Sequence, residues 1–279
     1  MTDTARNPDN FCYRHPDRQS FIICQRCGRT VCSECQTQAA VGVHCPECVR
    51  EARESAPRTS RGTRTRIKRS LRPSSGVPVV TYTLIGINLA LYLAQWVSGG
   101  AVYQALAYYP PFTAAEPWRM ITSAFLHSPA SILHILFNMY SLFIFGPIIE
   151  HAVGRARFVA LYLLAAFGGS VAVLLLAPGA VVVGASGAIF GLLGAFFVIQ
   201  RRLGGNNMQL LIVIGLNLVI GFIVPGVAWQ AHLGGLVVGA AVAAVYMATR
   251  HRSKKAVQIA SVVGIGVALV AITVAAVTV

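Results

Sequence analysis

A serine and a histidine in apolar stretches of the sequence carry the side chains needed for nucleophilic chemistry. Ser186 lies in the sequence GASG and His232 in AHLGG. A serine hydroxyl is a weak nucleophile until a base removes its proton. A histidine can take that proton and later give it to a leaving amine. We therefore predict that Ser186 is a nucleophile and His232 its base.

Two further polar residues, His134 and Asn138, lie in the apolar sequence HILFN. They are four residues apart, so they share one face of a helix. An acyl-transfer intermediate needs fixed donors for its oxyanion. The candidates are the Asn138 amide, His134 and the backbone N–H of Ser186. Since no Asp or Glu occurs near this depth in the apolar segments, the sequence predicts a dyad rather than a triad.

Each of these residues also has a structural interpretation. A serine in an apolar helix often bonds to its own helix carbonyls, and a histidine followed by an asparagine could simply pin two helices together. Phe190, one turn after Ser186, could pack against the His232 ring or fill the core. The combination of all four polar residues favours catalysis.

The cysteines form a second group with metal chemistry. All seven lie between Cys12 and Cys48, and together with one histidine they form four pairs with two residues between members. The pairs are Cys12 and His15, Cys24 and Cys27, Cys32 and Cys35, and Cys45 and Cys48. Such pairs on a cytosolic segment favour metal over disulfides. Eight ligands fit two tetrahedral Zn²⁺ sites.

This spacing resembles a B-box-type zinc finger. A cross-braced arrangement would join the first pair with the third and the second with the fourth, although exchanges between them stay open, and His44 is an alternative to its neighbour Cys45. With all ligand positions filled, we expect two structural Zn²⁺ ions and no cofactor for catalysis. The zinc-binding module would bind a cytosolic protein or regulate the chain.

The remaining composition indicates a membrane protein. The chain has 279 residues, 55% hydrophobic and 11% charged, whereas soluble domains carry about 25% charged residues. A membrane-spanning helix needs about 20 apolar residues. The candidate spans are residues 78–98, 130–149, 156–176, 182–200, 208–224, 229–249 and 256–278. The fourth and fifth are short.

Charge sets the expected orientation. The net charge is +14, and nine of the 23 basic residues lie from Arg50 to Arg72, before the first span. Basic residues in this position are typical of segments that set the orientation of a protein in the membrane, so we favour that role over nucleic-acid binding. Basic residues also mark every second connection, so we predict a multi-pass cell-membrane protein with a cytoplasmic N-terminus and an outside C-terminus. The second, fourth and sixth spans then run in one direction, which brings His134, Ser186 and His232 to similar depth.

Four parts follow from these patterns. Residues 1–50 form the zinc-binding module, 51–76 a basic disordered linker, 77–250 the membrane core, and 251–279 an additional span. Helix faces made of small residues allow two helices to pack closely. Such faces are formed by Gly187, Gly191 and Gly194 in the fourth span, and by Gly235 and Gly239 in the sixth. The outer connection of residues 99–129 is either an interfacial anchor or a lid.

The membrane part resembles the rhomboid intramembrane proteases. The resemblance covers about residues 77–250 and rests on Trp118-Arg119, HILFN, GASG, AHLGG with Gly239, and Gly146, Glu150 and Gly154 at fixed spacing. It implies an all-α, six-helix bundle, here followed by a seventh helix, and the Ser186–His232 dyad with His134 and Asn138 on the oxyanion. It also implies single-span membrane substrates cut near the outer face, and structural roles for Trp118, Arg119 and Glu150.

Two other classes of function remain. A non-catalytic membrane scaffold would bind client helices and recruit cytosolic partners through the module, but the presence of both Ser186 and His232 argues against it. A transporter would place polar residues near the midplane of repeated halves. The sequence has no such repeat, and its polar groups gather towards one face.

Overall fold

The computed structural model describes residues 8–39, 42–55, 76–204, 207–224 and 226–278. The chain divides into two compact units, residues 1–69 and 70–279. Of the linker predicted at 51–76, residues 56–75 lie outside the described residues. Residues 51–54 continue helix α1 (Pro46–Glu54), so the folded part of the first unit extends past the expected end at residue 50. The helix continues because no breaker interrupts it before Ser55.

The N-terminal unit is built from short elements around a core of cysteines. Its strands pair as two antiparallel ribbons, β1 with β2 and β3 with β4. The elements are η1 (Pro8–Asn10), β1 (Phe11–Cys12), β2 (His15–Gln19), η2 (Ser33–Cys35), β3 (Thr37–Gln38), β4 (Val43–His44) and α1. Its buried apolar cluster consists of six cysteines and Val31. So small a core needs additional cross-links to be stable.

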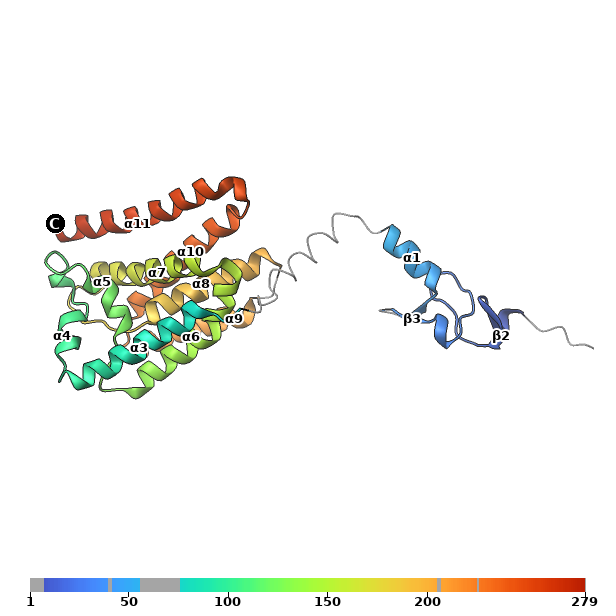
Figure 1. Cartoon of the computed structure of the whole chain (residues 1–279), viewed down its shortest axis with the longest axis horizontal. Helices are drawn as coiled ribbons and strands as arrows, with labels where there is room; N and C mark the ends of the chain where they lie inside the picture. Colours follow the sequence, from blue (N-terminus) through green and yellow to red (C-terminus); the bar gives the residue numbers. More distant parts are fainter. Residues whose placement is uncertain (1–7, 40–41, 56–75, 205–206, 225, 279) are drawn as a thin grey trace, which may run out of the picture. The chain divides into compact units, whose positions relative to one another are not determined.

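The second unit is a helix bundle in which the helices run roughly along one direction, with α11 at one margin (Figure 1). Its main helices are α3 (Val79–Val97), α6 (Ile132–Val153), α7 (Arg155–Leu176), α8 (Ser186–Arg202), α9 (Met208–Ile223), α10 (Trp229–Ala248) and α11 (Lys255–Thr278). Five are long and apolar enough to cross a membrane, whereas α8 has 17 residues and α9 has 16. This bundle confirms the predicted all-α membrane fold.

The connection predicted at residues 99–129 is a folded layer. It contains α4 (Ala101–Leu106), η3 (Pro110–Phe112), α5 (Arg119–Thr122) and η4 (Ser123–Phe125). Tyr108 and Met120 are each only 1% exposed, whereas Trp118 is half-exposed. Arg119 donates to the carbonyl oxygen of Ala107 at 3.0 Å and pairs with Glu116. The connection therefore packs as part of the bundle, which neither of the two sequence interpretations described.

The fourth predicted span begins later than expected. We predicted a helix over 182–200 with Ser186 about one turn inside it, but α8 begins at Ser186 itself. The preceding residues are extended because Tyr108 and Val182 exchange two backbone hydrogen bonds, at 3.1 and 2.8 Å. Gly184 then turns the chain with φ +126°, a conformation that L side chains rarely adopt. The predicted boundary was therefore wrong by four residues.

Helices α8 and α10 approach each other through glycine. A Cβ added at Gly235 would overlap the carbonyl oxygen of Gly187, and one added at Gly239 would overlap that of Gly191. Small residues permit such backbone contact between membrane helices. The glycine faces predicted from the sequence therefore do meet, and they bring the starts of α8 and α10 together.

Replacing Gly235 by valine is expected to push α10 away from α8 and to lower the free energy of unfolding by about 1–3 kcal/mol or more, because overpacking forces backbone shifts. Thermal unfolding in detergent would measure the loss. Gly215→Val in α9 is the matched control, since a Cβ there meets no atom within 4 Å. Equal unfolding temperatures for the two variants would contradict the glycine contact.

Candidate active site and metal-binding groups

The predicted nucleophile and base meet at the start of two helices. Ser186 is the first residue of α8, and His232 lies in the first turn of α10. The Ser186 Oγ and His232 Nε2 atoms are 2.9 Å apart, within hydrogen-bonding distance. The ring of Phe190 stacks on the His232 imidazole with centroids 4.2 Å apart and planes 7° apart. Phe190 thus holds the histidine ring in its orientation, and it is also buried in the core.

The other ring nitrogen of His232, Nδ1, is buried and has no hydrogen-bond partner among the described residues. His232 itself is only 7% exposed. In a triad a carboxylate would occupy this position and orient the ring. Here the orientation comes from the stacked Phe190 ring and from the bond to Ser186.

His134 lies beside the serine with its proton position fixed by the backbone. The N–H of Ser128 donates to His134 Nδ1 at 3.2 Å. Because Nδ1 accepts, a neutral His134 carries its hydrogen on Nε2. A Cβ built at Gly184 would lie 2.7 Å from that Nε2 atom and 3.7 Å from Ser186 Oγ. The Nε2–H of His134 is therefore a donor close to the nucleophile, and glycine at 184 leaves the space open.

Asn138 lies one turn further along α6. Its Nδ2 donates one hydrogen to the carbonyl oxygen of His134 at 2.8 Å, which leaves the second amide hydrogen for another acceptor. The Ser186 N–H, at the first position of α8, has no acceptor within its own helix. Three potential donors therefore come from Ser186, His134 and Asn138, which line one cavity.

A cavity of about 520 Å³ contains these side chains. Ser186, His232, His134 and Asn138 all line it. Phe137 and Phe145 of α6 form part of its wall, and Val213, Asn217 and Ile220 of α9 form another part. The two walls add mainly apolar side chains to the cavity away from the polar cluster.

Sequence reasoning missed the support behind these residues. Gln95 of α3 clamps the backbone of His127: its amide donates to the His127 carbonyl at 2.7 Å, and its oxygen accepts from the His127 N–H at 3.1 Å. The fully buried His127 ring lies against His134, with centroids 5.1 Å apart. A polar Gln95 at the end of an apolar span was the available signal. The Ser128 contact uses only the backbone, so side-chain type gave no signal for it.

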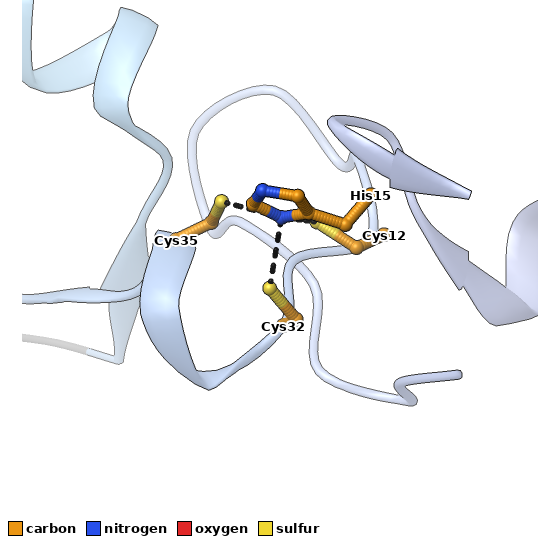
Figure 2. Close-up of side chains that lie close together, drawn as sticks. All are labelled: Cys12, His15, Cys32 and Cys35. Atoms are coloured by element: carbon orange, nitrogen blue, oxygen red, sulfur yellow. Dashed lines mark hydrogen bonds between the residues drawn. The ribbon is translucent and has the colours of Figure 1, made fainter. Parts of the chain in front are cut away.

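The N-terminal unit brings its candidate ligands together in two groups. The first contains Cys12, His15, Cys32 and Cys35. Figure 2 shows three sulfur atoms gathered about the His15 imidazole, with Cys32 and Cys35 on a separate segment of the chain. The distances from His15 Nδ1 to the sulfurs of Cys12, Cys32 and Cys35 are 3.8, 3.3 and 3.5 Å.

The second group contains Cys24, Cys27, Cys45 and Cys48, with 3.6 Å between the sulfurs of Cys27 and Cys45. Tetrahedral zinc, with bonds of about 2.3 Å to sulfur and about 2.0–2.1 Å to nitrogen, holds its ligand atoms about 3.5–3.8 Å apart. Both groups can therefore hold a metal ion. Their membership is the cross-braced arrangement of the four pairs, and Cys45, not His44, belongs to the second group.

Thiol acidity in the two groups also fits a cation. Burial opposes ionisation of Cys12 and Cys24, but backbone N–H groups outweigh it and lower the pKa of each thiol to about 6. Burial and neighbouring thiols raise the pKa of Cys35 to about 11 and that of Cys48 to about 12. Each group thus resists becoming fully ionised by itself. A divalent cation would remove this resistance by neutralising the thiolates.

A family model described as the Rhomboid domain matches residues 114–249 of the chain, which contain all four polar residues of the cavity. RHOMBOID-like protein 6, mitochondrial, of Arabidopsis thaliana is 38% identical over 131 residues, which cover 44% of this chain and 42% of that protein. Rhomboid protease GluP of Bacillus subtilis is 32% identical over 179 residues, 59% of this chain and 34% of that protein.

YdcA of Bacillus subtilis, whose name also assigns it to the rhomboid group, is 35% identical over 170 residues. These cover 59% of this chain and 74% of YdcA. The chain spans well under half the length of the first two relatives, at 42% and 34%.

Proposed function

Since this chain belongs to the rhomboid family, we propose that it is an intramembrane serine endopeptidase. The observation that carries the proposal is the 2.9 Å contact between Ser186 Oγ and His232 Nε2 inside a cavity of a membrane-embedded bundle. GluP, which is named a rhomboid protease, supports the same activity.

In the proposed reaction, His232 Nε2 removes the proton from Ser186 while Oγ attacks the carbonyl carbon of the peptide bond. The carbonyl oxygen becomes an oxyanion. The Ser186 N–H, the free hydrogen of Asn138 and His134 Nε2–H would donate to it. The tetrahedral intermediate then collapses, the C–N bond breaks, and His232 gives its proton to the leaving amine. Water, activated by the same histidine, hydrolyses the acyl-enzyme and restores Ser186.

The proposed substrates are membrane proteins with a transmembrane segment that unwinds locally. Nucleophilic attack requires an extended peptide at Ser186, because a helix buries its carbonyl groups in its own hydrogen bonds. Away from the polar cluster, the walls carry the apolar side chains of Phe137, Phe145, Val213 and Ile220, which suit the side chains of a segment that arrives from the bilayer.

We further propose that cleavage occurs near the outer face. The site lies where α6, α8 and α10 begin. Arg155, Arg201 and Lys255 lie at the opposite ends of the helices, and Arg119 lies in the folded connection that precedes α6. Positive residues favour the cytoplasmic side. This orientation places the N-terminal unit in the cytoplasm and the end of α11 outside.

Each cysteine group is proposed to bind one structural Zn²⁺, which would cross-link a unit that has little other core. The module would then serve as a regulatory or protein-binding element on the cytoplasmic side. No step of the peptide-bond chemistry involves the metal.

Zinc stoichiometry tests this assignment. We expect about two zinc ions per chain, and one after Cys32→Ala or Cys48→Ala, because each substitution removes a ligand from a different group. His44→Ala is the control and should retain both ions, since His44 lies outside both groups. Lower pH should weaken zinc retention, because protons compete with the cation for the cysteine thiolates. Full retention by both cysteine variants would refute the two-site assignment.

A serine-directed fluorophosphonate tests the proposed activity. The probe is applied to the purified full-length protein in detergent, and we expect it to label the wild type but not Ser186→Ala. Ser141→Ala is the matched control, because Ser141 lines the same cavity from α6 without a histidine contact. Equal labelling of Ser186→Ala would exclude Ser186 as the nucleophile. No labelling of the folded wild type would favour a non-catalytic scaffold, and cleavage of a single-span substrate would then decide.

A further inference from the structure

A second cavity lies at the end of the bundle opposite to the Ser186–His232 pair. Its volume is about 550 Å³, and it is bounded by the start of α7, the end of α10 and the first turns of α11. It shares no lining residue with the first cavity. Neither the proposed peptide-bond chemistry nor the proposed zinc sites use any of these residues.

The mouth of this cavity is positively charged. Arg155, Arg157 and Lys255 line it, and no acidic residue does. Glu150 contacts Arg155 from outside the lining, with its carboxylate 4.0 Å from the Arg155 guanidinium. Glu150 is already engaged, since it accepts hydrogen bonds from the backbone of Val80 and Thr81 at 3.1 and 2.8 Å. The three cations of the lining outnumber this carboxylate, so a net positive charge remains to attract an anion.

Arg157 is fixed in place by its neighbours. Its Nε donates to Gln258 Oε1 at 2.7 Å, and its guanidinium lies over the Tyr246 ring, 5.9 Å from the centroid. The Tyr246 hydroxyl in turn donates to the backbone carbonyl of Arg157 at 3.0 Å. Arg157 thus joins α7, α10 and α11. Arg155 and Lys255 are also exposed, and Arg155 contacts the Glu150 carboxylate at 4.0 Å, the limit for an ion pair.

The remaining wall of the cavity is apolar and continues along α11. It includes Ala160 of α7 and Ile259, Val262 and Val263 of α11. Ile259 and Val263 are 54% and 57% exposed, so this side opens to the surroundings of the bundle. Because α7 and α11 are both long enough to span a membrane, those surroundings are acyl chains.

From this combination we propose that the cavity binds an anionic phospholipid of the bilayer. The phosphate lies between Arg155 and Lys255, and one acyl chain follows the apolar wall of Ala160, Ile259 and Val263. Basic pockets between transmembrane helices suit lipid phosphates in this way. A free phosphate would satisfy the cations but leave the apolar wall uncovered, and a neutral lipid would leave the cations without a counter-charge.

Lipid retention by the full-length protein tests the proposal. Purified protein is incubated with detergent micelles containing phosphatidylglycerol or phosphatidylcholine of identical acyl chains, and the bound lipid is counted by native mass spectrometry. The wild type should retain phosphatidylglycerol in preference to phosphatidylcholine. Arg155→Gln combined with Lys255→Gln should lower that retention about tenfold or more, because each cation near the lipid contributes separately.

The matched control carries two equal charge losses elsewhere. Arg201→Gln with Lys254→Gln removes two cations outside the cavity and should retain phosphatidylglycerol like the wild type. Ala160→Phe fills the apolar wall without changing charge and should also abolish retention, so it decides the question if the double variant does not fold. The proposal would be overturned if the wild type retained both lipids equally, or if the control and test variants lost phosphatidylglycerol equally. It would also be overturned if glycerol 1-phosphate alone raised the unfolding temperature as much as phosphatidylglycerol does.

Discussion

Replacing His232 by glutamine is expected to lower kcat for a membrane substrate by about 10⁴-fold or more, since loss of the base removes proton transfer in both halves of an acyl-transfer reaction. Glutamine can still hydrogen-bond Ser186 but cannot accept and return its proton at neutral pH. A gel-based assay with a single-span substrate in liposomes would measure the loss. KM should change little, because the imidazole contacts the nucleophile and not the flanking segment.

The control for this substitution is His151→Gln. His151 lies at the far end of α6, where its Nε2 contacts the carbonyl oxygen of Gly76 at 2.9 Å. It should leave kcat near that of the wild type. A His232→Gln variant that is folded and cleaves as fast as His151→Gln would exclude His232 as the base.

Replacing Asn138 by alanine is expected to lower kcat by about 10²- to 10³-fold, the typical cost of losing one oxyanion donor. The effect should fall on kcat rather than KM, because the amide meets a full negative charge only in the tetrahedral intermediate. Single-turnover cleavage at saturating substrate separates this effect from binding.

Asn217→Ala is a close control for Asn138→Ala. Both asparagines line the same cavity, and both donate to the carbonyl four residues earlier at 2.8 Å. Asn217 lies on α9, away from the serine contacts described above. If both substitutions slowed cleavage equally, the loss would come from the cavity wall and not from the oxyanion.

Much of the bundle could be predicted from the sequence because membrane helices obey simple rules. Length and apolar composition located the seven helices, although they could not locate the start of α8. That start depends on the backbone exchange between Tyr108 and Val182, which joins segments more than seventy residues apart. The periodicity of a short apolar run contains no information about such a partner.

The candidate site also has features that the sequence predicts and features that it does not. Ser186, His232, His134 and Asn138 were identifiable because polar side chains are costly in an apolar segment. The proton position on His134 was not, because it depends on the N–H of Ser128, and every residue except proline has that group. The wall formed by α9 was also hidden, since its apolar side chains look alike whether they face lipid or a cavity.

The glycine contact between α8 and α10 has a consequence for how such a sequence can change over evolution. The spacing of Ser186 and His232 is set where one main chain rests on another, at Gly187 with Gly235 and at Gly191 with Gly239. Few positions are therefore constrained in identity, and a mutation among the lipid-facing residues of either helix needs only to preserve apolar character. Lineages can diverge widely over that surface and still inherit the same spacing of Ser186 and His232.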